Sequence, residues 1–382
     1  MTTKNFIAKL RERGLIAQIS HEHELNQILE KSYCNEKGIP YAVYCGLDPT
    51  AASLHVGNLV PLMMLRRAQD VGLTPIVVFG GATGFIGDPT GRQEMRPMNT
   101  REQIEKYITN FKVLVSRYFK TDVPNPPIYV NNFDWIGPMS WLDFARDVGS
   151  HFTVARLLSA DANKTRFQEG GLTFMELSYQ LLQSYDFLHL YQKHNCIMQF
   201  GGDDQWSNVL GGADLIRRVV QGKAFAVTTP LLVGSDGKKF GKTAGNAIWL
   251  DPTMTSPYEL FQFFRNIHDA DVGQMLRVFT FLSLEEIKII LENKNINAAK
   301  EQMAFEVTKI IHGEEQAQKA LETAKALFSG NATDFSSAPT TKVTKEEIAE
   351  GLDILNLLLR CELSPSRGEG RKLIQGGGLS VN

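Results

Sequence analysis

The chain has 382 residues, of which 43% are hydrophobic and 21% charged, and its formal net charge is −2 at pH 7. These values are ordinary for folded proteins, so they exclude a mainly disordered or fibrous chain. One hydrophobic core rarely extends beyond ~250–300 residues, so we expect more than one domain. No apolar run approaches the ~20 residues of a membrane-spanning helix. The near-neutral charge argues against polyanion binding by bulk charge.

Short β-rich runs alternate with helical patterns over residues 41–250. The predicted strands are Tyr41–Cys45, Pro75–Gly80, Pro127–Asn131, Cys196–Phe200 and Thr229–Gly234. The predicted helices between them are Gly57–Val71, Thr100–Tyr118 and Gln205–Val220. This alternation favours an α/β fold with a doubly wound parallel sheet of the Rossmann type.

The chain becomes helical between residues 256 and 328. Ser283 and Glu286 form a capping box, and Asp271 is a predicted cap for a helix at residues 272–279. An all-α domain is therefore expected after the sheet.

A Ser-, Thr- and Pro-rich segment at residues 329–344 has the composition of a linker. An apolar stripe from Ile348 to Leu359 then predicts one helix, and a short basic helix with Arg371 and Lys372 follows it. Only about 38 residues lie beyond the linker, which is few for an independent core, so we expect this module to be incomplete.

The cysteines are widely spaced, at Cys34, Cys45, Cys196 and Cys361. No two are close enough in sequence to form a metal-binding or redox pair. We therefore expect reduced, unpaired thiols and a cytoplasmic protein.

The first candidate site lies where a strand gives way to the helix that begins near Gly57. Ligands of open α/β sheets bind outside the carboxyl ends of the strands, and a helix N-terminus favours phosphate. His55 and Asn58 can donate hydrogen bonds to phosphate oxygens, while Gly57 permits close approach to the backbone. Helix capping is the alternative role of these side chains.

Five glycines lie within the twelve residues from Gly80 to Gly91, in a loop that also carries Asp88. The spacing matches neither a P-loop nor a dinucleotide-binding loop. Asp88 can accept a cation, and a purely structural loop is the alternative.

A helix predicted after Thr173 carries Tyr179, Gln183 and Asp186 at positions i, i+4 and i+7, which places them on one face. Apolar residues surround this polar stripe. Because buried polar side chains need partners, the stripe is either a solvated face or a binding surface for a small polar ligand with a cationic amine.

Two further strand ends carry candidate groups. Gly201 and Gly202 permit close approach to the backbone, and Asp204 beside them can accept the hydroxyls of a ribose. Lys239 and Lys242 lie on a glycine-rich turn, where they suit a leaving polyphosphate, although a solvated basic loop is the alternative.

Together these motifs resemble the two signatures of class I aminoacyl-tRNA synthetases, and most specifically the bacterial-type tyrosyl-tRNA synthetases. The resemblance covers nearly the whole chain. It rests on these runs: Tyr44-Cys-Gly-Leu-Asp-Pro-Thr50, His55-Val-Gly-Asn58, Gly80-Gly-Ala-Thr-Gly-Phe-Ile-Gly-Asp-Pro89, Asp134-Trp-Ile-Gly-Pro138, Asp147-Val-Gly149, Tyr185-Asp-Phe187, Gly201-Gly-Asp-Asp-Gln-Trp206 and Lys239-Phe-Gly-Lys-Thr243. Asn58 stands where a second His is common in the family, and Arg92 stands where a Lys is common.

The resemblance implies a tyrosine–tRNA ligase activity, in which ATP activates tyrosine and the tyrosyl group passes to the terminal ribose of tRNA(Tyr). In the implied tyrosine pocket, Tyr44 and Asp186 meet the phenol OH, and Asp88, Tyr179 and Gln183 hold the ammonium group. Gln199 and Gln205 complete that pocket. The residues implied at ATP or the adenylate are Gly46, Asp48, Thr50, His55, Gly57, Gly201, Gly202, Asp204 and Lys242. The residues implied in catalysis, at the pyrophosphate, are His55, Asn58, Arg92, Arg96, Lys239, Lys242 and Thr243.

The resemblance also implies the domain organisation. A catalytic domain would occupy residues 1–250, with a dimerisation insertion at about 133–174. A helical anticodon-binding domain would follow at 251–328. Beyond the linker, an S-four-type RNA-binding module would occupy 345–382.

The implied partners are L-tyrosine, ATP with Mg²⁺, tRNA(Tyr) and a second copy of the chain, with no protein-bound metal and no membrane. The acceptor arm of the tRNA would lie near Arg156, Lys164 and Arg166. Three other functions remain open at this point. They are a tryptophanyl-tRNA synthetase, an adenylyltransferase for a small metabolite, and a non-catalytic RNA-binding relative.

Overall fold

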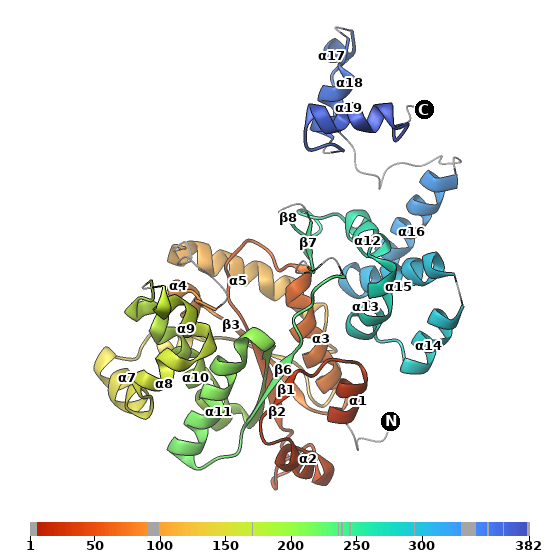
Figure 1. Cartoon of the computed structure of the whole chain (residues 1–382). Coiled ribbons are helices and arrows are strands. Elements are labelled where there is room, and N and C mark those ends of the chain that lie inside the picture. Colours follow the sequence, from red (N-terminus) through yellow and green to blue (C-terminus); the bar gives the residue numbers. More distant parts are fainter. Residues whose placement is uncertain are drawn as a thin grey trace. The chain divides into compact units, whose positions relative to one another are not determined.

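The computed structural model describes residues 6–90, 99–169, 171–235, 237, 240–243, 246–293, 295–329, 341–349, 351–361 and 363–379 (Figure 1). The chain divides into two compact units, Met1–Gln318 and Lys319–Asn382. All the candidate site residues belong to the first unit.

A six-stranded sheet lies at the centre of the first unit, with the strand order β1-β6-β5-β2-β3-β4. Its strands are β1 (Gln18–Ile19), β2 (Ala42–Leu47), β3 (Thr74–Phe79), β4 (Ile128–Asn131), β5 (Cys196–Gly202) and β6 (Phe225–Thr229). Neighbouring strands run parallel, except that β1 pairs antiparallel with β6. From β2 the chain adds β3 and β4 on one side, whereas β5 and β6 lie on the other side of β2. The boundary between β2 and β5 is therefore the switch point of a doubly wound sheet. The predicted fold class is confirmed.

Four of the five predicted strands are confirmed to within two residues, and the fifth is wrong. The chain forms β6 at Phe225–Thr229, not a strand at Thr229–Gly234. Every residue of β6 is buried, because the strand lies between β5 and β1, whereas Leu231 and Val233 are exposed. Both segments are apolar, so the sequence pattern could not separate them. The two-residue β1 was not predicted.

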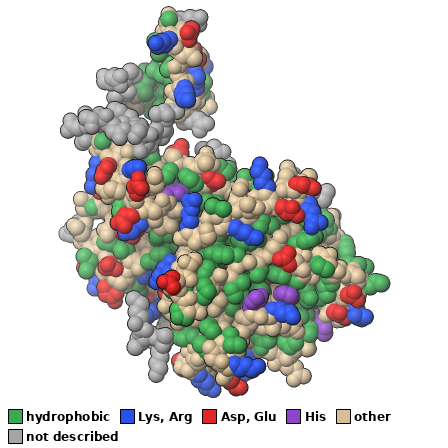
Figure 2. All heavy atoms as spheres, turned by 180° about the vertical axis from the view of Figure 1, so that it is seen from behind, with side chains coloured by type: hydrophobic (Ala, Val, Ile, Leu, Met, Phe, Trp, Pro, Cys, Tyr) green, Lys and Arg blue, Asp and Glu red, His purple; other side chains and the backbone are tan. Residues whose placement is uncertain are grey.

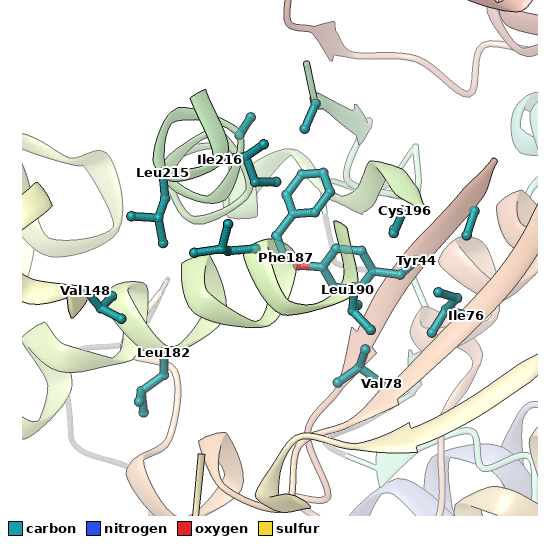
Figure 3. Packing of buried hydrophobic residues seen from close by; sticks show 14 of the residues in the cluster. Tyr44, Ile76, Val78, Val148, Leu182, Phe187, Leu190, Cys196, Leu215 and Ile216 are labelled. Carbon is teal, nitrogen blue, oxygen red and sulfur yellow. The ribbon is translucent and has the colours of Figure 1, made fainter. Parts of the chain in front are cut away.

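Long helices cover the two faces of the sheet. On one face, α10 (Phe174–His194) and α11 (Trp206–Val220) pack over Tyr44, Ile76 and Val78. Figure 3 shows the Tyr44 ring beside Phe187 of α10 in this core. The other face carries α3 (Val56–Asp70) and α5 (Arg101–Ser116). The helices predicted over these segments are confirmed.

Shorter elements connect these parts of the first unit. The α-helices are α1 (Phe6–Glu12), α2 (Glu22–Lys31), α4 (Thr83–Ile86), α6 (Phe133–Ile136), α7 (Trp141–Asp147), α8 (Val154–Ser159) and α9 (Asp161–Gln168). The 3-10 helices are Gly149–His151, Asp203–Gln205 and Asp269–Asp271, and a small hairpin pairs β7 (Lys242–Thr243) with β8 (Asn246–Ala247).

Helices dominate the chain after the hairpin, as predicted. They are α12 (Pro257–Arg265), α13 (Val272–Phe279), α14 (Leu284–Glu292), α15 (Ile296–His312) and α16 (Glu314–Ser329). The capping box of Ser283 and Glu286 is confirmed. Asp271 does precede α13, but its side chain makes no capping hydrogen bond, so the predicted cap is wrong.

The second unit contains α17 (Lys345–Ala349), α18 (Ile354–Arg360) and the predicted basic helix α19 (Arg367–Gln375). The single helix predicted over residues 348–359 is wrong. Gly351 has a φ of +88°, which a helix interior does not accommodate, and it separates α17 from α18. Most of the predicted linker, residues 330–340, lies outside the described residues.

The surface carries no large concentration of one charge on the face that Figure 2 displays. Lys and Arg side chains alternate there with Asp and Glu, and hydrophobic side chains are exposed between them. All four cysteines are free thiols, as expected. Among the helices of the described segments, none is long and apolar enough to cross a lipid bilayer.

Candidate active site

The candidate residues gather at the carboxyl ends of β2, β3 and β5, around the switch point of the sheet. Tyr44 of β2 and Gln199 of β5 are direct register partners across that point. The predicted helical stripe of Tyr179, Gln183 and Asp186 lies on α10, which covers the same face of the sheet. Segments distant in sequence therefore form one site in the place where open α/β sheets bind ligands.

Tyr44 and Asp186 form the predicted phenol-binding end of the site. Tyr44 is 1% exposed, and its hydroxyl has no hydrogen-bond partner among the described residues. Burial and the neighbouring Asp186 raise the pKa of Tyr44 well above its ordinary value, so its hydroxyl stays a donor. Burial also raises the pKa of Asp186 to about 7, against the opposing effect of its hydrogen bonds. When Asp186 is ionised, the two side chains offer one O–H donor and one carboxylate acceptor, which is the complement of a phenol.

Two residues to which the sequence assigned no role hold Asp186 in place. Trp135 Nε1 donates to Asp186 Oδ1 at 2.8 Å, and Asn132 Nδ2 donates to Asp186 Oδ2 at 3.0 Å. Asn132 also accepts from the Ala82 N–H and donates to Thr83 Oγ1. All of its hydrogen-bonding groups are thus engaged, which fixes the carboxylate of Asp186 in one orientation.

The same polar network continues to Asp48 at the end of β2. Thr83 Oγ1 donates to Asp48 Oδ1 at 2.7 Å, and the Tyr179 hydroxyl donates to Asp48 Oδ2 at 2.8 Å. Tyr179, predicted at the ammonium group, therefore also orients a carboxylate predicted at the adenylate. Asn132 links this end of the site to the phenol-binding end through Thr83.

Asp88 and three glutamines supply the remaining polar groups. Asp88 is buried, accepts from Gln205 Nε2 at 2.6 Å, and accepts from the Thr90 N–H at 2.9 Å. Gln183 Oε1 and Gln199 Oε1 are buried with no hydrogen-bond partner in the described part of the chain. Leaving buried polar atoms unpaired costs folding free energy, so these acceptors together with the Tyr44 hydroxyl indicate a pocket completed by a polar ligand.

The first signature forms the N-terminus of α3, where its side chains cap the helix. His55 Nδ1 accepts from the Gly57 N–H at 3.0 Å, and Asn58 Oδ1 accepts from the His55 N–H at 3.0 Å. The capping alternative is therefore confirmed for both side chains. Because Nδ1 accepts, the neutral imidazole carries its proton on Nε2, which makes that atom a donor suited to phosphate. A Cβ at Gly57 would lie 2.8 Å from His55 Cε1, so only glycine leaves room for this arrangement.

The second signature lies directly against the first. Val56 N donates to Ile248 O at 2.9 Å, and Ile248 N donates to Gly241 O at 3.0 Å. A Cβ on Gly241 would lie 3.4 Å from Val56 Cβ. Backbone contacts therefore join two motifs that are almost two hundred residues apart in sequence.

For some of the residues predicted at the pyrophosphate, the structure describes the backbone alone or nothing. Lys242 and Thr243 form β7, next to the α3 N-terminus through Gly241. Lys239, Arg92 and Arg96 lie outside the described residues.

The predicted adenylate residues border the same edge of the sheet. Gly46 is exposed near the end of β2, and Thr50 is exposed in the loop that follows it. Gly201 and Gly202 end β5, and Asp204 is exposed in the 3-10 helix behind them.

That 3-10 helix is anchored by Asp203, which the sequence did not single out. Asp203 Oδ1 accepts from Gln18 Nε2 and from Thr228 Oγ1, each at 2.8 Å. The antiparallel strand β1 thereby holds the turn that carries Asp204.

The residues expected at the tRNA acceptor arm differ in their surroundings. Arg166 is 7% exposed, and its guanidinium donates to Glu176 Oε1 at 2.8 Å and to Gly171 O at 2.8 Å. This arginine is therefore part of the interior. Its expected place near the acceptor arm of the tRNA stays a prediction. Arg156 forms an ion pair with Asp214. In the described ranges, no group of His, Cys, Asp and Glu side chains has the arrangement to hold a metal ion.

Comparison with known proteins identifies relatives over almost the full length. A family model described as class I tRNA synthetases (W and Y) matches residues 36–329. A tyrosine–tRNA ligase of Acetivibrio thermocellus is 49% identical over 376 residues, which cover 98% of this chain and 90% of the relative. A tyrosine–tRNA ligase of Clostridium beijerinckii is 46% identical over 380 residues, which cover 99% of this chain and 91% of the relative.

Solved structures of tyrosyl- and tryptophanyl-tRNA synthetases share the fold of this chain. A C-terminally truncated mitochondrial tyrosyl-tRNA synthetase of Aspergillus nidulans superposes with a TM-score of 0.75 at 30% identity, covering 85% of this chain and 94% of that one. A tryptophanyl-tRNA synthetase of Plasmodium falciparum shares the fold, with a TM-score of 0.57 at 15% identity over 90% of this chain and 88% of that one. The chain therefore belongs to the class I tRNA synthetases of the tryptophan and tyrosine group.

Proposed function

We propose that this synthetase is a tyrosine–tRNA ligase. It activates tyrosine with ATP to tyrosyl-adenylate and pyrophosphate, and then transfers the tyrosyl group to the terminal ribose of tRNA(Tyr). The observation that carries the proposal is the buried pair of Tyr44 and Asp186, which supplies the donor and the acceptor that a phenol OH needs. The relatives named above support it, since they match this chain over about nine-tenths of their own length.

The first step needs positioning and charge stabilisation rather than a general base. The carboxylate of tyrosine is itself the nucleophile, and it attacks the α-phosphorus of ATP as pyrophosphate leaves. The Nε2–H of His55 and the N-terminus of α3 stabilise the developing negative charge. Lys239 and Lys242 of the second signature add positive charge at the same place. In the second step, the terminal ribose hydroxyl of the tRNA attacks the activated carbonyl and AMP leaves.

The other end of tyrosine is an ammonium group, which the pocket meets with acceptors. Asp88 supplies a carboxylate that Gln205 holds in place, and Gln183 Oε1 is an unpartnered acceptor among the described residues. Tyr179 orients Asp48 at the border between tyrosine and the adenylate. Gly46, Thr50, Gly202 and Asp204 then border the nucleotide. Mg²⁺ enters with ATP as part of the substrate, and the reaction takes place in the cytoplasm.

Tryptophan fits this pocket less well than tyrosine does. The indole ring has one N–H donor and no acceptor, so it would leave the buried hydroxyl of Tyr44 without a partner. A non-catalytic relative is also disfavoured, because the polar groups expected in the tyrosine pocket are all present and its carboxylates are held by hydrogen bonds.

Amino-acid-dependent ATP–pyrophosphate exchange, run without tRNA across all twenty amino acids, tests the proposal. We expect exchange with tyrosine alone, because only tyrosine pairs both the Tyr44 hydroxyl and the Asp186 carboxylate. Exchange with tryptophan would assign the chain to the sister activity. A folded protein that binds tRNA but catalyses no exchange would be the non-catalytic relative.

We also propose that the protein is a homodimer through the region of α7 to α10. Large hydrophobic side chains are exposed on these helices, which lie together at one side of the sheet in Figure 1. They are Trp141, Leu142, Val154, Phe167 and Phe174. The rings of Trp141 and Phe174 lie 5.6 Å apart, so two of the helices contribute to one apolar surface. Such surfaces mark interfaces, and two-fold dimers are the commonest homo-oligomers.

Replacing Leu142 with glutamate should convert the dimer into monomers. Leu142 is 77% exposed, so the change leaves the folded subunit intact while it places a charge in the buried interface. Ile289→Glu is the matched control, because Ile289 is 67% exposed on α14 and should leave the dimer unchanged. Sedimentation of each variant measures the mass against the 42.7 kDa of one chain. A wild-type monomer that charges tRNA would contradict the proposal.

A further inference from the structure

The turn that precedes the second signature is anchored by a carboxylate from the helical region. Ser235 N donates to both carboxylate oxygens of Asp271 at 3.1 Å, and Ser235 Oγ donates to Asp271 Oδ2 at 3.2 Å. Asp271 is buried, although it belongs to a residue type that is mostly exposed. Its side chain makes no cap for α13, so these bonds to Ser235 are the contacts that account for its burial.

The signature itself is anchored by an aromatic ring. The Phe240 ring lies 5.1 Å from that of Phe263 on α12 and 5.7 Å from that of Phe279 at the end of α13. Phe264 and Phe279 are fully buried, so this cluster belongs to the core of the helical region. Phe240 follows Lys239 directly and lies two residues before Lys242, so the ring fixes the chain between the two lysines.

The opposite end of α13 is held by α3, the helix that begins at the first signature. The buried guanidinium of Arg67 donates to the carbonyl oxygens of Arg277, Val278 and Thr280. A cation at a helix C-terminus also interacts favourably with the helix dipole. Helix α13 therefore contacts α3 at one end and the turn before the second signature at the other.

We infer that Asp271 is a positioning residue for pyrophosphate release. Through Asp271, α13 holds the second signature in place against the N-terminus of α3. This inference rests on the proposed function for its effect on catalysis. The lysines of the second signature act on the leaving group, and a displacement of about 1 Å at a reacting group can cost roughly 100-fold in rate. The groups assigned to tyrosine lie on β2, β5, α10 and the loops after β3 and β5. Loss of the contact between Asp271 and Ser235 should therefore slow the chemical step and leave tyrosine binding unchanged.

The matched variants are Asp271→Ala and Asp269→Ala. Both residues belong to the same 3-10 turn, but Asp269 is a surface residue paired with Lys300. In tyrosine-dependent pyrophosphate exchange, we expect Asp271→Ala to lower kcat by roughly 10- to 100-fold with KM for tyrosine within about twofold. Asp269→Ala should match the wild type. Asp271→Asn should recover most of the loss, because its amide oxygen still accepts from Ser235 N.

Hydrogen exchange of the same proteins measures the anchor without catalysis. The amides of Phe240 and Ile248 donate to Leu232 O and Gly241 O, and they should exchange faster in Asp271→Ala but not in Asp269→Ala. If Asp271→Ala does not fold, Phe240→Leu removes the second anchor and should give the same fall in kcat and the same faster exchange at Ile248.

Three results would overturn the inference. The first is a kcat in Asp271→Ala no lower than in Asp269→Ala, and the second is wild-type hydrogen exchange at both amides. The third is a parallel rise in KM for tyrosine, which would show general damage instead of positioning. If the wild-type protein catalyses no tyrosine-dependent exchange, the proposed function is wrong, and hydrogen exchange alone then decides whether Asp271 anchors the segment.

Discussion

Replacing Asp186 with asparagine should lower kcat/KM for tyrosine by roughly 10- to 100-fold, because a hydrogen bond to a charged group contributes about 1.5–3 kcal/mol. Asn132 and Trp135 donate to this side chain, and in the proposed complex the phenol of tyrosine does so too. A carboxylate can accept from all three donors with its two oxygens. Asparagine has one oxygen, and its NH₂ group faces a donor. The kcat/KM for phenylalanine should change little, since phenylalanine has no hydroxyl to lose. Pyrophosphate exchange with both amino acids measures the selectivity.

Tyr44→Phe is the companion variant, and its effects on activity and on stability should have opposite signs. The Tyr44 hydroxyl is buried without a partner among the described residues, so removing it relieves a desolvation cost in the ligand-free protein. The variant should be at least as stable as the wild type while it discriminates less well against phenylalanine. An Asp186→Asn enzyme with wild-type selectivity would refute the assignment of the phenol site.

The pH dependence of tyrosine use provides a second test of Asp186. Burial raises the pKa of this carboxyl to about 7 in the ligand-free protein. Below that pH the group is protonated and loses its strength as an acceptor, so kcat/KM for tyrosine should rise as the pH increases through about 7. The kcat/KM profile reports ionisations of the free enzyme. The rise should disappear in Asp186→Asn, and a profile that is flat in the wild type would contradict the role of this carboxylate.

Much of this site could be predicted because local patterns determine it. The spacing of Tyr179, Gln183 and Asp186 depends only on the period of one helix, and the structure places all three on α10 at the switch point. Likewise, His55 and Asn58 flank a helix start that the strand-to-helix pattern indicates. The sequence could not separate a capping role from phosphate binding at these positions. The structure shows the capping role, and the tautomer of His55 that it requires is also compatible with phosphate binding.

The residues that sequence reasoning missed act through contacts between distant segments. Asn132 and Trp135 hold Asp186 across more than fifty residues of sequence, and no periodicity relates them. Asp271 was assigned to the helix that it precedes, because capping is the commonest local role of such an aspartate. Its actual partner, Ser235, lies 36 residues earlier. Sequence patterns assign a role to a residue from its neighbours in sequence. The roles of these residues depend instead on partners that only the tertiary structure brings close.

Replacing Arg166 with methionine should lower the free energy of unfolding by about 3–5 kcal/mol, because it leaves the charge of Glu176 buried without its partner. Arg166 is 7% exposed and Glu176 is 2% exposed. Glu176 also accepts from Thr173 N and Thr173 Oγ1, and so caps α10, the helix that carries Tyr179 and Asp186. Urea unfolding measures the loss. Lys288→Met is the control, because the Lys288–Glu292 pair is exposed and should contribute less than about 1 kcal/mol.

The same variant decides between a structural role and contact with RNA. If Arg166 is structural, Arg166→Met assayed at a temperature where it is folded should keep the wild-type KM for tRNA. The double variant Arg166→Met, Glu176→Leu should then be more stable than the single one, because it removes the unpaired charge and loses only a helix cap worth about 1 kcal/mol. If Arg166→Met is as stable as the wild type and its KM for tRNA is higher, Arg166 is instead an RNA-binding residue. The hydrogen bonds of Arg166 to Glu176 and Gly171 favour the first result, since binding RNA would require the guanidinium to leave both partners.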